Sequence, residues 1–211
     1  MSQKAIVLLS GGLDSTTTLY FAKKKYDCRA LIFDYGQRHR KEVRTAVAIA
    51  KAAKVPYQIV NFALPWKGSS LLDSSSRLPS GRSLKSIGKG IPSTYVPGRN
   101  TIFLSFAVSY AEAIGAKAVF IGANAIDFSG YPDCRPAYYK AMQKAVSLGT
   151  KAGGIRIVTP LINMTKSQII KLGRRLRAPL EKTWSCYMGG KEPCGVCDSC
   201  VLRRKGFEEA R

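Results

Sequence analysis

Residues 5–19 read AIVLLSGGLDSTTTL, and this stretch decides the fold class. Ala5–Leu9 is a short, wholly apolar run of the kind that is buried on both faces in a parallel sheet. Gly11 and Gly12 then allow the backbone to turn tightly and to approach a ligand closely, and a helix is expected from Ser15 to Tyr26. A loop between a strand and the positive end of a helix is an anion site, so we expect phosphate binding here.

The rest of the chain continues the alternation of strands and helices. Further strands are expected at Arg29–Tyr35, Tyr57–Phe62, Ala118–Gly122 and Ile155–Val158. Further helices are expected at Arg40–Ala53, Asn100–Ile114, Pro136–Leu148 and Thr165–Arg177, the last opened by a capping box of Thr165 and Gln168. Ala63–Pro97 breaks the pattern, and a segment of this length without periodicity is typical of a lid or an insertion. The alternation predicts an α/β fold with a doubly wound, mostly parallel sheet.

Composition bounds the class of protein and the kind of partner. The chain has 211 residues, of which 45% are hydrophobic, enough for a sizeable core; disordered, collagen-like and coiled-coil proteins are excluded. Lys and Arg number 34 against 13 Asp and Glu, and the formal charge of +21 favours an anionic partner such as nucleic acid, a phosphate-bearing ligand or a membrane surface. The run Ala5–Leu9 is too short for a signal peptide, and Glu112 and Lys117 interrupt the most apolar long stretch, so we expect a cytoplasmic protein without a membrane span.

Four of the six cysteines crowd near the end of the chain. Cys186, Cys194, Cys197 and Cys200 include two C-x-x-C steps, and four thiolates at this spacing suit one structural, tetrahedral Zn²⁺ per chain. An iron–sulfur cluster is the competing interpretation, because thiolates alone do not decide the metal. A redox-active C-x-x-C pair is a third alternative.

The loop Ser10–Ser15, SGGLDS, is neither a Walker A motif nor a Rossmann fingerprint. It resembles the SGGxDS pyrophosphate loop of the ATP pyrophosphatases, the PP-loop superfamily, whose fold is an adenine-nucleotide α-hydrolase-like doubly wound sheet. The resemblance implies that ATP binds along residues 9–19, which are Leu9, Ser10, Gly11, Gly12, Leu13, Asp14, Ser15, Thr16, Thr17, Thr18 and Leu19. It also implies that Asp14 helps to hold Mg²⁺, whose charge offsets that of the leaving pyrophosphate.

Further motifs narrow the resemblance. Polar loops follow the predicted strands, where open α/β sheets bind their ligands, although each loop alone also reads as an ordinary cap or turn. The order SGGxDS, YGQRH, PGRN, DFSGYPDCR and then C-x7-C-x2-C-x2-C resembles the family of 7-cyano-7-deazaguanine synthases over nearly the whole chain, from Ala5 to about Phe207. This resemblance implies an ATP-dependent C–N ligase that converts 7-carboxy-7-deazaguanine and ammonia to the nitrile, through an adenylated carboxylate and an adenylated amide, on the route to queuosine.

The same resemblance suggests which side chains act. Ser10, Asp14, Ser15 and Arg99 are the expected catalytic residues. The expected substrate-binding residues are Arg38, Arg99, Asn100, Asp127, Tyr131 and Asp133. A carboxylate among them would accept the base N–H groups, Tyr131 would stack on the ring, and an arginine would hold the substrate carboxylate. Cys134 as a catalytic thiol is a lesser alternative, and His39 reads as a surface side chain.

The charge keeps other functions open. A tRNA-acting PP-loop enzyme that adenylates a base carbonyl would use the basic stretches at 77–89, 166–177 and 203–205 to bind phosphates, although solvated faces are the simpler explanation of these stretches. A non-catalytic zinc-knuckle nucleic-acid binder is the third possibility, and the intact SGGLDS argues against it. We expect a nucleotide-binding domain at 1–183 with an insertion at 63–97, a zinc-binding segment at 184–211, a small-molecule substrate, no membrane partner and, from the resemblance, a homodimer.

Overall fold

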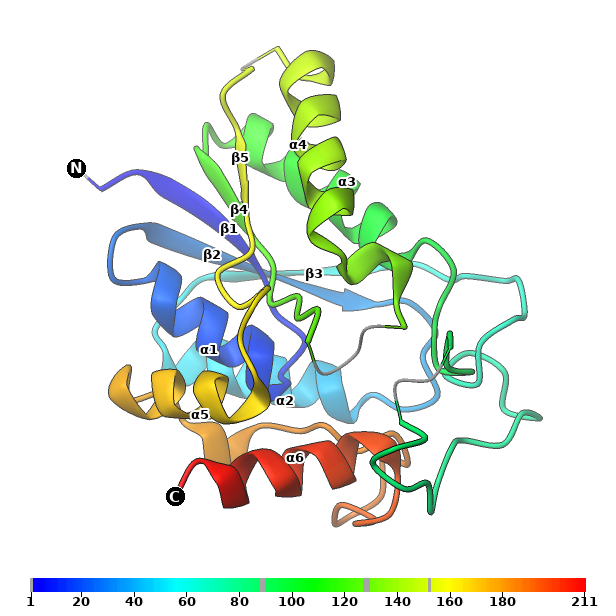
Figure 1. Cartoon of the computed structure of the whole chain (residues 1–211). Coiled ribbons are helices and arrows are strands. Elements are labelled where there is room, and N and C mark those ends of the chain that lie inside the picture. The colour runs from blue at the N-terminus through cyan, green and yellow to red at the C-terminus, as the bar shows by residue number, and fades with distance from the viewer. Residues whose placement is uncertain (1, 88–89, 127–129, 152) are drawn as a thin grey trace.

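A computed structural model describes residues 2–87, 90–126, 130–151 and 153–211. Its centre is a five-stranded sheet in which all neighbouring strands are parallel, in the order β3-β2-β1-β4-β5 (Figure 1). The strands are β1 (Lys4–Leu8), β2 (Asp27–Asp34), β3 (Tyr57–Asn61), β4 (Ala118–Phe120) and β5 (Arg156–Val158). This arrangement confirms the predicted α/β fold, and each strand lies within two residues of its expected bounds.

Helices cover both faces of the sheet, which explains why Ala5–Leu8 of the central strand β1 has no polar position. Along β1, Ala5 and Val7 face the layer of α1 (Leu13–Ala22) and α2 (Lys41–Ala52). Ile6 and Leu8 point to the opposite face, against α3 (Arg99–Ala113) and α4 (Pro136–Gly149). Because successive side chains of a strand alternate between faces, a run with no polar position is what two covered faces require.

Two further helices form an outer layer on α1. α5 (Lys166–Arg175) packs on α1, and α6 (Asp198–Glu209) packs on α5 (Figure 1). The capping box at the start of α5 is confirmed: Thr165 Oγ1 accepts the Gln168 N–H, and the Gln168 side chain accepts the Thr165 N–H. The helix α6 was not predicted from the sequence. Two short 3₁₀ turns, η1 (Pro132–Cys134) and η2 (Leu180–Lys182), complete the elements.

The first helix was predicted too late and too long. α1 begins at Leu13 rather than Ser15 and ends at Ala22 rather than Tyr26. The N–H groups of Lys25 and Tyr26 both bond to the Ala22 carbonyl, and the chain then enters β2 at Asp27. The early start places Gly12 at the N-cap, so that the loop leads directly into the helix.

The segment 63–97 contains neither helix nor strand among its described residues, as expected, and it is tied to the cysteine-rich end of the chain. Ser80 forms an isolated antiparallel bridge with Cys197, and the Gly81 N–H donates to the carbonyl of Val196. Arg82 pairs with the Asp198 carboxylate, which is 2% exposed. None of the helices in the described part of the chain is long and apolar enough to cross a membrane.

Candidate active site

A cavity of about 290 Å³ opens at the carboxyl ends of β1, β2 and β4. The direction in which strands are added reverses between β1 and β4, and this is the point at which doubly wound sheets bind ligands. The cavity is lined by segments from the whole length of the chain. Its polar lining residues include Ser10, Asp14, Ser15, Glu42, Arg99, Asn100, Tyr131, Lys166, Tyr187 and Arg203.

The SGGLDS loop is held in a shape that only glycine allows at one position. Gly11 has φ +79°, and a Cβ there would lie 2.7 Å from the backbone nitrogen of Ala46 and 2.8 Å from the carbonyl oxygen of Glu42. The loop therefore packs directly on the backbone of α2. Ser10 and Ser15 brace it from inside, with 3.0 Å between their hydroxyl oxygens, and the Ser15 hydroxyl donates to the Gly12 carbonyl.

The amino end of α1 faces the cavity. No side chain caps this helix at Gly12, and Leu13, Asp14 and Ser15 of its first turn line the cavity. Gly122, just after β4, admits the close approach, since a Cβ there would lie 2.9 Å from the Ser15 nitrogen. The backbone N–H groups and the positive end of a helix together bind anions. The arrangement is therefore suited to phosphate groups.

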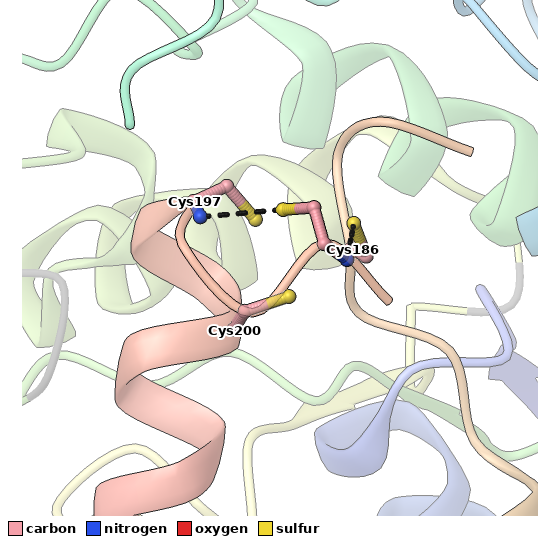
Figure 2. A group of neighbouring side chains, drawn as sticks. Cys186, Cys197 and Cys200 are labelled. Atoms are coloured by element: carbon pink, nitrogen blue, oxygen red, sulfur yellow. Dashed lines mark hydrogen bonds between the residues drawn. The ribbon is translucent and has the colours of Figure 1, made fainter. Parts of the chain in front are cut away.

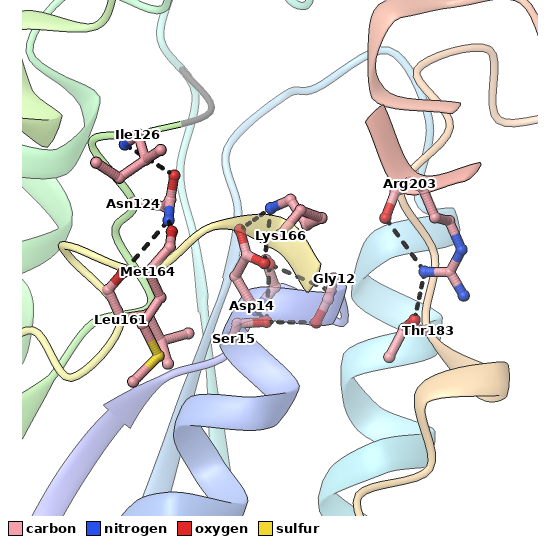
Figure 3. Close-up of polar contacts among 12 residues, drawn as sticks. Gly12, Asp14, Ser15, Asn124, Ile126, Leu161, Met164, Lys166, Thr183 and Arg203 are labelled. Carbon is pink, nitrogen blue, oxygen red and sulfur yellow. Dashed lines mark hydrogen bonds and ion pairs between the residues drawn. The ribbon is translucent and has the colours of Figure 1, made fainter. Parts of the chain in front are cut away.

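Asp14 is paired within the cavity lining with Lys166. The Lys166 ammonium lies 2.8 Å from Oδ1 and 2.7 Å from Oδ2 of Asp14 (Figure 3). Lys166 is the first residue of α5, and sequence analysis read it only as part of a basic stretch. The residue expected to help hold a cation thus contacts an ammonium group in this structure.

The other end of the cavity is cationic and aromatic. Arg99 donates to the Tyr35 hydroxyl over 3.0 Å, and both residues line the cavity. Tyr131 lies nearby, with its hydroxyl 2.8 Å from that of Thr94, and burial raises its pKa. Tyr187 lines the same end. A planar anionic ligand would find here a guanidinium for its charge and aromatic faces for its ring.

Two predicted substrate residues hold the start of α3. Oδ2 of the buried Asp133 accepts the Asn100 N–H over 3.2 Å, and the Asn100 amide donates to the Asp133 carbonyl. Asn100 lines the cavity, whereas Asp133 does not. Burial, with the neighbouring Asp133, raises the pKa of the Cys134 thiol to about 12, so the thiol is protonated at neutral pH. A protonated thiol is a poor nucleophile, which argues against the catalytic thiol considered for Cys134.

The structure places other predicted residues away from the cavity. Arg38 donates to the carbonyls of Ser70, Ser74 and Ser76, and so braces the 63–97 segment. Of the eleven residues predicted to bind ATP, six line the cavity and five do not, namely Gly11, Thr16, Thr17, Thr18 and Leu19. Thr16–Leu19 are fully buried in α1. Asp127 lies outside the described residues, so its role stays a prediction.

Part of the cavity wall was not predicted from the sequence. Trp184, Tyr187 and Arg203 line the cavity from the cysteine-rich end of the chain. Arg203 donates to the Thr183 hydroxyl over 2.6 Å (Figure 3). It also donates to the Leu180 carbonyl over 2.9 Å. Glu42 of α2 also lines the cavity, and burial raises its pKa. The motif pattern could have pointed to Trp184 and Tyr187, which flank Cys186, but no pattern marks Glu42.

The four cysteines converge as predicted. The sulfur atoms of Cys186, Cys194, Cys197 and Cys200 all lie within 4.8 Å of one another. Figure 2 shows Cys186, Cys197 and Cys200 of this cluster. Four sulfurs around one Zn²⁺ would lie about 3.8 Å apart, given Zn–S bonds of about 2.3 Å. Backbone N–H groups of Met188 and Cys194 point at the Cys186 sulfur over 3.4 and 3.3 Å, as suits a thiolate. The set could hold a metal ion, and its position beside Trp184 makes it a support of the cavity wall.

Comparison with known proteins decides the family. The family model described as "Queuosine biosynthesis protein QueC" matches residues 4–211. The chain belongs to the QueC family. Relatives named 7-cyano-7-deazaguanine synthase include one from Nostoc punctiforme, 56% identical over 98% of this chain and 95% of the relative. Another, from Thermoplasma acidophilum, is 55% identical over 99% of this chain and 89% of its own. As a member of the QueC family, the chain is an enzyme, which confirms the enzyme class predicted from the sequence.

Solved structures with low sequence identity share the fold. The U34-tRNA thiolase NcsA from Methanococcus maripaludis, solved with its [4Fe-4S] cluster, has a TM-score of 0.50 and 18% identity, covering 98% of this chain and 65% of its own. The NMN synthetase from Francisella tularensis has a TM-score of 0.50 and 16% identity, covering 100% of this chain and 87% of its own. At this level of identity, the two structures support only the fold of the QueC-family chain.

Proposed function

We propose that the chain is a 7-cyano-7-deazaguanine synthase that uses ATP and ammonia to convert 7-carboxy-7-deazaguanine to the nitrile. The observation that carries the proposal is a single cavity that joins two kinds of binding surface. One end is the SGGLDS loop on the amino end of α1, and the other contains Arg99 and the tyrosines. The identity of about 55% to relatives of that name over nearly the whole chain supports it.

ATP solves a problem of leaving groups. A carboxylate is a poor electrophile because ammonia would have to displace an oxide. When a carboxylate oxygen attacks the α-phosphorus of ATP, pyrophosphate leaves and AMP becomes the leaving group on the acyl carbon. The backbone N–H groups in the first turn of α1 and the hydroxyls of Ser10 and Ser15 would bind the phosphates and stabilise the charge that develops on pyrophosphate.

The second half of the reaction repeats the same activation. Ammonia attacks the acyl carbon, AMP leaves with the carboxylate oxygen, and one proton is lost, which gives the amide. The amide oxygen then attacks a second ATP, and pyrophosphate leaves again. Loss of AMP with that oxygen and of both protons from nitrogen leaves the nitrile. No covalent enzyme intermediate is required, in agreement with the protonated state of Cys134.

The cationic end of the cavity would position the base. Arg99 would hold the substrate carboxylate, since its hydrogen bond to Tyr35 fixes the direction of the guanidinium. Tyr131 would stack on the ring. Asn100 and Asp133 would act by fixing the start of α3, and therefore the position of Arg99, which is its first residue. Arg38 would hold the insertion rather than the substrate.

Two metal ions belong to the proposal. Asp14 fits a role in holding the Mg²⁺ that accompanies ATP, because its two oxygens face a cation in the cavity, and Mg²⁺ would offset phosphate charge. One Zn²⁺ per chain would be held by Cys186, Cys194, Cys197 and Cys200. The thiolates would fix the segments that carry Trp184 and Arg203 into the cavity wall.

The QueC match favours this small-molecule reaction over the tRNA-acting alternative. We further propose a cytoplasmic homodimer with a nucleotide-binding domain at 1–183 and a zinc-binding segment at 184–211. Nucleic acid would bind only nonspecifically, through the charge of +21.

The test is a product analysis. The protein is incubated with ATP, Mg²⁺, ammonia and 7-carboxy-7-deazaguanine, and AMP and the nitrile are quantified by mass spectrometry. We expect both products, and Arg99→Lys should raise the KM for the base far more than that for ATP. Release of pyrophosphate only after tRNA is added would support the tRNA-acting alternative instead.

A further inference from the structure

Lys166 is enclosed at the phosphate end of the cavity. Its side chain is 11% exposed, and its ammonium makes the two short contacts to Asp14 described above. The two residues lie 152 positions apart in the sequence. A surface lysine at the start of a helix would point to solvent, so tertiary packing holds this one in place.

Three neighbouring features fix the position of Lys166. Gly206 of α6 leaves room for its aliphatic stem, since a Cβ on Gly206 would overlap the Lys166 side chain. The capping box at Thr165 sets the first turn of α5. Asn124, which lines the cavity, donates to the carbonyls of Leu161 and Met164 and so fixes the chain that enters α5 (Figure 3). The ammonium therefore stands in a prepared position over the amino end of α1.

The SGGLDS loop lacks the lysine with which a Walker A loop contacts the phosphates of ATP. Pyrophosphate leaves with more charge than it carries in ATP, and a cation close to its oxygens stabilises that charge. Lys166 is a cation at that place in the fold although it comes from a different helix.

We propose that Lys166 binds the phosphates of ATP and that Asp14 is its partner only while the nucleotide is absent. This inference rests on the proposed function as far as ATP is the ligand. When ATP enters, the ammonium exchanges the carboxylate for phosphate oxygens. The two oxygens of Asp14 are then released to hold the Mg²⁺ that arrives with the nucleotide. The pair thus keeps an acidic and a basic side chain ready in one cavity without an unpaired charge in either state.

The first test compares Lys166→Met with Lys171→Met. Lys171 lies on the exposed face of the same helix, so both variants lose one positive charge from α5. Dissociation constants for ATP and for adenosine are measured by calorimetry on the full-length protein. We expect Lys166→Met to weaken ATP binding about 10- to 100-fold, the effect of one hydrogen bond to a charged group. Its adenosine binding should stay within about twofold of that of Lys171→Met, which also shows that the variant is folded.

The second test uses Asp14→Asn without added Mg²⁺. If Asp14 competes with phosphate for the ammonium, removal of its charge should strengthen ATP binding several-fold under this condition. Lys166→Arg keeps a cation and should recover most of the ATP affinity lost in Lys166→Met. A purely structural ion pair would instead make Asp14→Asn and Lys166→Met change ATP affinity in the same direction.

Equal ATP affinities of Lys166→Met and Lys171→Met would overturn the inference, and so would equal losses of ATP and adenosine binding. The proposed function fails separately. If the wild-type protein forms no nitrile, and ATP binding is weakened in Lys166→Met but not in Lys171→Met, the proposed reaction is wrong and the phosphate contact stands. If the wild-type protein forms nitrile and Lys166→Met does so with unchanged ATP affinity, the phosphate contact alone is wrong.

Discussion

Three glycine-to-alanine variants separate the two reasons for glycine in the loops that follow the strands. Gly11 has φ +79° and lies against the backbone of α2, so an alanine there meets both strain and a clash. Gly36 has φ +83°, and a Cβ there would meet no described atom within 4 Å, so an alanine meets strain alone. Gly122 has no positive φ but would place a Cβ 2.9 Å from the backbone of α1, so an alanine meets a clash alone.

The expected costs follow from these contacts. A left-handed conformation costs a residue with a Cβ about 1–2 kcal/mol, which is the full effect expected for Gly36→Ala. Overpacking against a rigid neighbour costs about 1–3 kcal/mol, which is the effect expected for Gly122→Ala. Gly11→Ala should lose both, or about 2–5 kcal/mol of the free energy of unfolding. With an m-value of about 2 kcal/mol/M, its urea midpoint should fall by about 1–2.5 M.

Urea unfolding followed by far-ultraviolet circular dichroism measures these differences, and calorimetry then measures ATP affinity in each folded variant. We expect ATP affinity to fall in Gly11→Ala and Gly122→Ala, because both move the loop or helix end that faces the cavity. Gly36→Ala should bind ATP as the wild type does. If Gly11→Ala and Gly36→Ala lose the same stability, the close packing of the loop on α2 is refuted.

Three further outcomes are expected. Cys194→Ser, or dialysis against a chelator, should lower both the amount of bound metal and the affinity for ATP, because Trp184 packs against the four-cysteine cluster and lines the cavity. A metal-free protein that binds ATP normally would contradict this. Arg82→Ala should cost about 1–3 kcal/mol and speed proteolysis within the insertion, because it leaves the buried Asp198 carboxylate without its guanidinium; unchanged cleavage would argue against the tether. Burial raises the pKa of the Cys28 thiol from 9.0 to about 12, so the unfolded chain releases this proton first and stability falls as pH rises between those values. Above pH 9, the free energy of unfolding of the wild type should fall by about 1.4 kcal/mol more per pH unit than that of Cys28→Ala, as measured by urea unfolding. Parallel pH dependences of the two proteins would refute the pKa shift.

The sheet and its order of elements could be predicted because their signals are local. Ala5–Leu9 has no polar position, and this alone indicates a strand covered on both faces. The capping box of Thr165 and Gln168 is likewise a local signal, since a stretch of four residues is enough to indicate the start of a helix. α6 gave no such signal: its sequence DSCVLRRKGFEE buries only Asp198, Cys200 and Gly206, so the apolar periodicity of a helix is absent.

The directions of the site side chains could not be predicted. Lys166 reads as one charge of a solvated helix until α1 and α6 are seen to enclose it. Motif order placed Asp133 and Arg38 near the ligand loops, but their hydrogen bonds to α3 and to the insertion depend on packing between distant segments. Spacing did predict the four-cysteine cluster, since two C-x-x-C steps restrict where four sulfurs can lie.

The most direct test of the central claim is the fate of isotopically labelled ammonia. The protein is incubated with 7-carboxy-7-deazaguanine, ATP, Mg²⁺ and ¹⁵N-ammonium, and the products are analysed by mass spectrometry. The account predicts a nitrile that carries one ¹⁵N atom, with AMP and pyrophosphate formed only when the carboxylated base is present. ATP turnover that is independent of this base, or a base recovered without the label, would contradict it.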